Sequence, residues 1–212
     1  MLALDANTGK RKWHFQTVHH DLWDYDIPCP PNLVQVEREG KLVDAVAQVT
    51  KSGHVFVFNR ETGEPLFPIE ERPVPLSTLQ GESAWPTQPL PVKPLPYARQ
   101  SLTENDLNPH SGNRDSLKVL FSESRYEGVY TPLTRHGSIV YPGLDGGAEW
   151  GGAAVDPEGI MYLNSNEMAW LISLNKPNRE IEIIGQQIFA KNCATCHGET
   201  LRGNSASGYR SL

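Results

Sequence analysis

The sequence LALDANTGKRKWHF occupies residues 2–15, and FVFNRETGEPLF occupies residues 56–67. In both stretches apolar residues flank a polar run that ends in Thr-Gly, which is the pattern of a strand, a tight turn and a second strand. Aligning the two Thr-Gly pairs places Asp5 on Asn59 and Trp13 on Phe67. A repeat longer than about 40 residues, built from short strands and one aromatic position, predicts the blades of a β-propeller.

A weaker copy of this pattern, AVDPEGIMYL, lies at residues 154–163. Before it, residues 65–96 contain nine prolines, which cannot donate to a sheet ladder. We therefore predict an ordered but irregular surface connection there, with a disordered linker as the alternative. The sequence further predicts a short helical turn within residues 102–108, strand-like alternation within 130–141 and a helix over 183–192.

The composition narrows the class of protein. The chain has 212 residues, a formal net charge of −6 and 38% hydrophobic residues, which excludes a charge-rich disordered tail and an apolar membrane protein. Its acidic balance, without basic clusters, argues against nucleic acid as a partner. No apolar run of about 18 residues occurs, so we expect no transmembrane helix within these residues.

The run CATCH, residues 193–197, is the sharpest local motif. Two thiols three positions apart can each form a thioether with a haem vinyl group, and the adjacent His197 can then reach the iron. The alternatives are a chance cysteine pair and half of a zinc site. The third cysteine, Cys29, provides no disulfide framework.

The haem motif also bears on where this piece of chain comes from. Covalent haem is attached outside the bacterial cytoplasm, yet the first 13 residues lack the basic and apolar regions of a signal peptide. The 15 residues after His197 are too few to enclose a haem and contain no methionine to serve as its second ligand. We therefore expect an internal fragment of a longer, exported protein.

Two further stretches carry groups that could do chemistry. HHDLWDYD, residues 19–26, holds three carboxylates and two imidazoles, which are costly to bury without a metal, partner or substrate. For this stretch, the alternative is a solvated loop between strands. Lys51 is a separate candidate, and taken alone it is more often a surface lysine. YPGLDGGAEWGG, residues 141–152, places five glycines around Trp150, which suits either close approach to a flat ligand or a tight turn between blades.

Taken together, these stretches resemble a known family. HFQTVHHDLWDYDIP (14–28), TKSGHVFVFNRETGEPLFPIEERPVP (50–75) and EWGGAAVDP (149–157) resemble dehydrogenases that use pyrroloquinoline quinone (PQQ). Within these, the chain resembles quinoprotein glucose dehydrogenases with a c-type cytochrome domain. The resemblance implies an eight-bladed β-propeller with PQQ near its axis and calcium or magnesium beside it.

The resemblance also implies roles for particular residues. Asp24 would be the catalytic base, and Lys51 would hydrogen-bond a quinone oxygen. Asp24 and Asp26 would lie near the metal, and Trp150 and Gly151 would line the cofactor pocket. In the haem segment, Cys193 and Cys196 would form the thioethers and His197 would bind the iron. Leu144 stands where membrane-bound glucose enzymes have Asn, which favours a related sugar or alcohol as an alternative substrate.

The sequence therefore predicts an all-β fold, a partial eight-bladed quinoprotein propeller over residues 1–178 with the irregular connection 65–96, followed by the helical start of a truncated cytochrome c domain over 179–212. We expect a periplasmic enzyme, or one on the outer face of the inner membrane, with membrane association through regions outside this chain. It would oxidise a sugar or alcohol and pass electrons through haem c to a quinone or cytochrome.

Two other functions stay open at this stage. One is a non-catalytic propeller scaffold fused to an electron-carrier cytochrome c, and the other is a cytochrome that uses the propeller only as a docking surface. Because an incomplete propeller leaves sheet edges exposed, we expect this piece to be inactive by itself.

Overall fold

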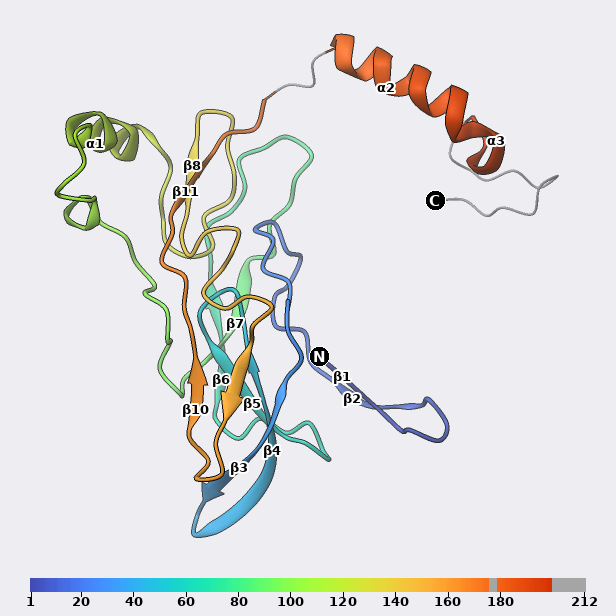
Figure 1. Cartoon of the computed structure of the whole chain (residues 1–212), viewed down its shortest axis with the longest axis vertical. Helices are drawn as coiled ribbons and strands as arrows, with labels where there is room; N and C mark the ends of the chain where they lie inside the picture. The colour runs from blue at the N-terminus through green and yellow to red at the C-terminus, as the bar shows by residue number, and fades with distance from the viewer. Residues whose placement is uncertain (176–178, 200–212) are drawn as a thin grey trace. The chain divides into compact units, whose positions relative to one another are not determined.

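The computed structural model of this chain describes residues 1–175 and 179–199 (Figure 1). The chain divides into two compact units, Met1–Leu174 and Asn175–Leu212, and each is described by itself. Short antiparallel strands account for most of the regular structure in the first unit, while the described part of the second is helical.

In the described residues, the first unit contains eleven strands in five small sheets. The strands are β1 (Leu2–Leu4), β2 (Arg11–His14), β3 (Asn32–Arg38), β4 (Lys41–Val49), β5 (Val55–Asn59), β6 (Ile69–Pro73), β7 (Thr87–Pro91), β8 (Ser138–Val140), β9 (Ala153–Val155), β10 (Met161–Leu163) and β11 (Trp170–Ile172). They pair as β1-β2, β3-β4-β5, β6-β7, β10-β9 and β11-β8, all antiparallel. The sheets stay separate in this part of the chain and close no ring (Figure 1).

The two copies of the repeated pattern form the same turn. Asp5 Oδ1 accepts hydrogen bonds from the backbone N–H groups of Asn7 and Thr8, at 3.1 and 2.9 Å. At the aligned position, Asn59 Oδ1 accepts from Glu61 and Thr62, at 2.9 and 3.1 Å. Such local side-chain acceptors stabilise the turn, so the repeat predicted from the sequence is confirmed here. The weaker copy also forms a hairpin, from β9 to β10.

The aromatic residues of the first copy pack onto the second. The Trp13 ring lies 5.8 Å from the Phe58 ring, and its Nε1 donates to the carbonyl of Arg60 at 3.0 Å. Phe15 lies 4.8 Å from Phe58, again between ring centroids. Burying these rings fixes the β1-β2 hairpin against the sheet β3-β4-β5.

The expectation of an irregular connection over residues 65–96 is wrong for part of this stretch, because β6 and β7 pair within it. Beyond the strands, Val92 N–H donates to the carbonyl of Pro68 at 2.9 Å, which sets the hydrogen-bonded pairs at every second position from there. Pro73, Pro89 and Pro91 all fall on the intervening pairs. Those pairs need no donor toward the partner strand, so the prolines do not interrupt the ladder.

The helices match the sequence in part. A 3₁₀ turn, Glu104–Asp106, lies within the predicted helical turn. Helix α1 (Arg114–Glu123) was not predicted, although Leu117, Leu120 and Phe121 have the three- and four-residue spacing of a helix face and line one small apolar cavity. In the second unit α2 (Arg179–Asn192) confirms the predicted helix, and α3 (Ala194–His197) follows it.

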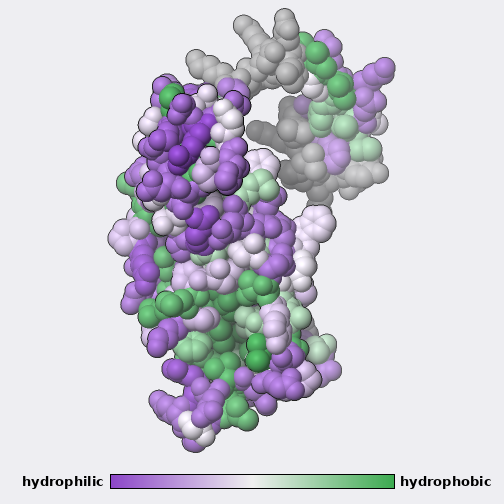
Figure 2. All heavy atoms as spheres, turned by 60° about the vertical axis from the view of Figure 1, so that its left-hand side comes forward, coloured by the Kyte–Doolittle hydropathy of each residue, from purple (hydrophilic) through white to green (hydrophobic). Residues whose placement is uncertain are grey.

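Two observations bear on exposed apolar surface. Hydrophobic residues gather on the lower part of the first unit, beneath a more hydrophilic region (Figure 2). Large apolar side chains of β1, β3 and β4, namely Leu4, Leu33 and Leu42, are exposed. None of the described helices is both long enough and apolar enough to cross a membrane.

The repeat supplies a matched test of packing. Gly9 and Gly63 both have positive φ, +66° and +75°, but a Cβ on Gly63 would overlap the Trp13 ring whereas one on Gly9 meets nothing within 4 Å. Gly9→Ala should therefore cost about 1 kcal/mol of unfolding free energy. Gly63→Ala should cost roughly 1–3 kcal/mol more, because of the added overlap. Denaturant unfolding compares the two, and equal losses would contradict the packing of Trp13 on Gly63.

Candidate active site

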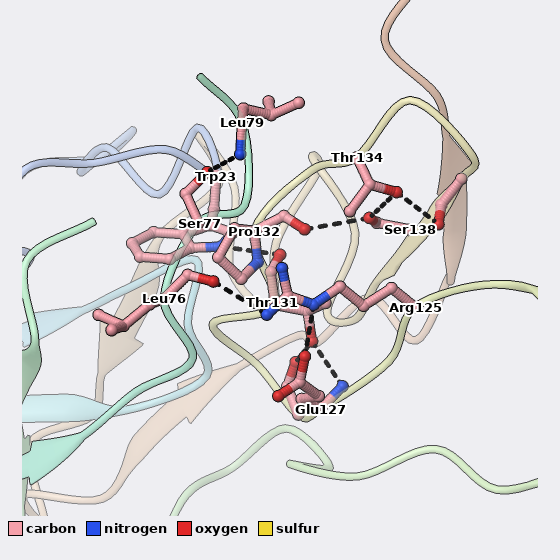
Figure 3. A network of polar contacts seen from close by, with 12 residues as sticks. Trp23, Leu76, Ser77, Leu79, Arg125, Glu127, Thr131, Pro132, Thr134 and Ser138 are labelled. Carbon is pink, nitrogen blue, oxygen red and sulfur yellow. Dashed lines mark hydrogen bonds and ion pairs between the residues drawn. The ribbon is translucent and has the colours of Figure 1, made fainter. Parts of the chain in front are cut away.

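In the acidic segment, residues 19–26, the side chains of the last four residues point alternately inward and outward. Trp23 and Tyr25 are buried, and the Trp23 Nε1 donates to the carbonyl of Thr131 at 2.9 Å (Figure 3). Asp24 and Asp26 lie on the other side, with side chains 65% and 61% exposed. Burial of the two aromatic rings therefore turns both carboxylates out of the core.

Lys51 joins the two carboxylates. Its Nζ lies 3.1 Å from Asp24 Oδ2 and 2.7 Å from Asp26 Oδ1, and its side chain is only 8% exposed. Burial alone lowers the pKa of Lys51, but the hydrogen bonds and negative charges of Asp26 and Asp24 outweigh it, so the pKa is raised. Lys51 is therefore a buried ammonium whose charge is compensated from the acidic segment.

The glycine-rich segment, residues 141–152, explains why Lys51 is buried. Gly147 N–H donates to the Lys51 carbonyl at 2.7 Å. A Cβ on Gly146, which has φ of +68°, would overlap Cβ and Cγ of Lys51. The absence of a side chain at Gly146 thus lets the backbone cover the methylene stem of the lysine and leaves its ammonium facing Asp24 and Asp26.

These segments line one open hollow of about 610 Å³. It brings together four residues predicted from the sequence: Asp24, Lys51, Trp150 and Gly151. Asp26 joins them through its ion pair to Lys51. The Trp150 side chain is available to a ligand, since the residue is 83% exposed. The alternative of an isolated surface lysine is thus wrong for Lys51.

Other residues of the hollow were not singled out from the sequence: Leu144 was noted only for specificity, and Asp145, Glu149, Asn166, Met168 and Trp170 were missed. Asp145 and Glu149 lie within the glycine-rich stretch and could have been found there. Trp170 arrives from β11 and donates from Nε1 to Asp145 Oδ2 at 3.1 Å, a contact between distant residues that no local pattern reveals.

The backbone at Asp24 is itself unusual. Asp24 has φ of +60°, in the left-handed region that non-glycine residues seldom adopt. A residue held there costs roughly 1–3 kcal/mol and persists only where its surroundings impose it. This strain indicates that contacts of the neighbouring residues, rather than local preference, set the direction of the Asp24 carboxylate.

The hollow fits part of an anionic, planar cofactor. The Lys51 ammonium can donate to an oxygen of such a group, and the exposed indole of Trp150 can stack on its ring. The fit to a divalent metal is incomplete, since no cluster of three or more His, Cys, Asp or Glu able to hold one occurs among the described residues. Asp24 and Asp26 would supply two oxygen ligands where calcium takes six to eight.

The haem motif lies in the second unit. Cys193 directly follows α2, and its N–H donates to the Phe189 carbonyl at 2.8 Å. The N–H groups of Cys196 and His197 both donate to the Cys193 carbonyl, at 3.1 and 3.0 Å. One helical turn thus carries both thiols and the imidazole. The remainder of the expected cytochrome segment, residues 200–212, lies outside the described residues.

Comparisons with known proteins indicate the family of this chain. Residues 1–201 match the family model PQQ, described as "Glucose/ethanol/alcohol dehydrogenase, beta-propeller domain". A quinoprotein glucose dehydrogenase of Gluconobacter oxydans is 43% identical over 162 residues, which cover 74% of this chain and 20% of that protein. A probable quinate dehydrogenase (quinone) of Xanthomonas campestris is 38% identical over 189 residues, covering 87% and 24%.

Among solved structures, the quinohemoprotein alcohol dehydrogenase from Comamonas testosteroni matches with a TM-score of 0.47 and 22% identity, covering 81% of this chain and 20% of that one. The chain spans about a fifth to a quarter of the length of the two curated relatives.

His54 is buried in the turn of residues 50–54, which also carries Lys51, and it makes the stability of the fold depend on pH. Burial lowers the pKa of His54 from 6.5 to about 4, so the folded state favours the neutral ring. The free energy of unfolding is therefore highest above pH 6.5 and decreases as the pH falls toward 4. The decrease amounts to about 3 kcal/mol.

His54→Gln should flatten the acid limb of stability measured by denaturant unfolding between pH 4 and 7. His136→Gln serves as the control, because His136 is exposed. Identical pH profiles for the wild type and His54→Gln would refute this role of the buried ring.

Proposed function

Because this chain belongs to the PQQ family of glucose, ethanol and alcohol dehydrogenase β-propellers, we propose that the protein containing it oxidises a sugar or an alcohol. The observation that carries the proposal is the buried Lys51 ammonium held by Asp24 and Asp26 at the hollow that Trp150 lines. A buried cation beside carboxylates in a cleft is a typical active-site arrangement.

Asp24 is the general base of the proposed reaction. Its carboxylate lines the hollow and accepts the proton of the substrate hydroxyl. At the same time, the C–H bond on the carbon that bears this hydroxyl breaks and a hydride leaves. Bound PQQ would supply the acceptor for that hydride. Lys51 would donate a hydrogen bond to a quinone oxygen, and its charge would favour negative charge there. Trp150 would stack on the ring, and Gly151 would allow its close approach.

The proposal includes calcium or magnesium bound beside the cofactor, but it includes no step of the reaction on the metal. Asp24 and Asp26 are its proposed carboxylate ligands, and both already contact Lys51. A metal would compete with the ammonium for these oxygens. We therefore assign the proton transfer to Asp24 without a metal step.

Replacing the base tests this assignment. Asp24→Asn in the complete protein should lower PQQ-dependent dye reduction by roughly 10²- to 10⁴-fold, because an amide cannot accept the proton. PQQ should still bind, as measured by quenching of tryptophan fluorescence. Unchanged turnover would exclude Asp24 as the base, and failure of the wild-type protein to bind PQQ would favour the non-catalytic scaffold.

Asp26→Asn is the matched control. It makes the same change of charge and removes the shorter ion pair to Lys51, yet it leaves the proposed base in place. Its loss of turnover should therefore be clearly smaller than that of Asp24→Asn.

The second unit is the proposed electron carrier. Cys193 and Cys196 would hold a haem through thioethers and His197 would bind its iron, and this haem would supply electron transfer from the cofactor to a quinone or a cytochrome. This is supported by the helical turn that carries all three residues. Covalent haem in turn favours the periplasm or the outer face of the inner membrane.

Substituting the thiols tests the haem. The double variant Cys193→Ala, Cys196→Ala should lose covalently bound haem, seen as loss of the pyridine haemochrome spectrum after acid-acetone extraction. Cys29→Ala is the control, because that thiol is buried in the first unit beside Gln48. Full retention of the spectrum by the double variant would rule out this attachment site.

A further inference from the structure

Tyr25 lies between Asp24 and Asp26 in the acidic segment and points the opposite way. The residue is 1% exposed and packs with Trp23 and Tyr130, its ring centroids 6.3 and 5.8 Å from theirs. Its hydroxyl donates toward two carbonyl oxygens, those of Pro142 at 2.8 Å and Val129 at 3.1 Å. Because burial raises the pKa of Tyr25 well above its usual value, the phenol keeps the proton that it donates.

The Pro142 carbonyl connects Tyr25 to the opposite wall of the hollow. Pro142 begins the run that continues through Leu144, Asp145, Glu149, Trp150 and Gly151, all of which line the hollow. The phenol therefore ties the acidic segment to the start of the glycine-rich segment.

A second connection joins the same two segments through Lys51. Its ammonium binds Asp24 and Asp26, while its carbonyl accepts the N–H of Gly147. The acidic segment and the glycine-rich segment are thus held together at two points, one through Lys51 and one through Tyr25. Trp23 adds a third anchor for the acidic segment, on the Thr131 carbonyl (Figure 3).

We propose that Tyr25 is a positioning residue, whose hydroxyl sets the acidic segment against the glycine-rich segment and thereby aligns Asp24 with the cofactor wall at Trp150. The inference rests on the proposed function. It accounts for the positive φ of Asp24, since anchoring Trp23 and Tyr25 on either side leaves this residue little choice of backbone conformation. It also assigns a role to a buried hydroxyl that does not line the hollow.

Tyr25→Phe in the complete protein is the test, because it removes the hydroxyl and keeps the ring. We expect kcat to fall about tenfold with the substrate KM changed less than about twofold, as misalignment of the base slows the chemical step without removing a substrate contact. PQQ affinity, followed by quenching of tryptophan fluorescence, should fall several-fold because the wall bearing Trp150 is released.

Tyr130→Phe is the matched control. Tyr130 is buried in the same cluster and packs edge-on against both Trp23 and Tyr25, but its hydroxyl hydrogen-bonds to neither of the two carbonyls. This variant should keep the wild-type kcat and PQQ affinity. Equal losses in both variants would show general loosening of the core and would overturn the positioning role.

Amide hydrogen exchange provides a readout that does not depend on activity. In Tyr25→Phe, the amides of residues 143–152 should exchange faster than in the wild type and in Tyr130→Phe. Unchanged exchange, kcat and PQQ affinity in Tyr25→Phe would overturn the inference while leaving the proposed function intact. A wild-type protein that binds no PQQ, or an active Asp24→Asn, would instead refute the proposed function, and the exchange result would still decide whether Tyr25 holds the two segments.

Discussion

The need to compensate the buried Lys51 ammonium organises the first unit. A cation with an 8% exposed side chain is stable only with partners, and Asp24 and Asp26 supply them. Those carboxylates can face the lysine because Trp23 and Tyr25 turn the other way into the core. The glycine-rich segment then covers the lysine stem. The burial of the two aromatic rings and the close approach of the glycine-rich segment thus both position this one charge.

The fold could be predicted from the sequence where its determinants are local. The Asp5 and Asn59 turns depend on side chains that bond to backbone groups within three residues, so a repeated pattern reveals them. The pairing of β6 with β7 depends instead on which positions of a ladder each proline occupies, and the sequence does not show this register. Counting prolines alone therefore led to the wrong prediction for the part of residues 65–96 that forms β6 and β7.

The same distinction applies to the site. Asp24, Lys51, Trp150 and Gly151 were identified through resemblance to a family, and the structure brings them to one hollow. Trp170 reaches that hollow because β11 pairs with β8. Asn166 and Met168 reach it through backbone hydrogen bonds to Gly147 and Gly143, which are also distant in the sequence. No periodicity or motif within residues 164–172 points to this role. The anchoring function of Tyr25 is likewise visible only once Pro142 is known to face it.

The prolines of the β6-β7 hairpin have a consequence for assembly. On the pairs that exchange no hydrogen bond, each N–H points away from the partner strand, toward the place where a further strand would add. Pro89 and Pro91 remove these donors from β7, and Pro73 removes one from β6. The hairpin also supports the acidic segment, because the Gln88 side chain accepts from the His19 N–H and donates to the His19 carbonyl. Neither edge of the hairpin can present a full row of donors to another chain, so it is protected from edge-to-edge aggregation.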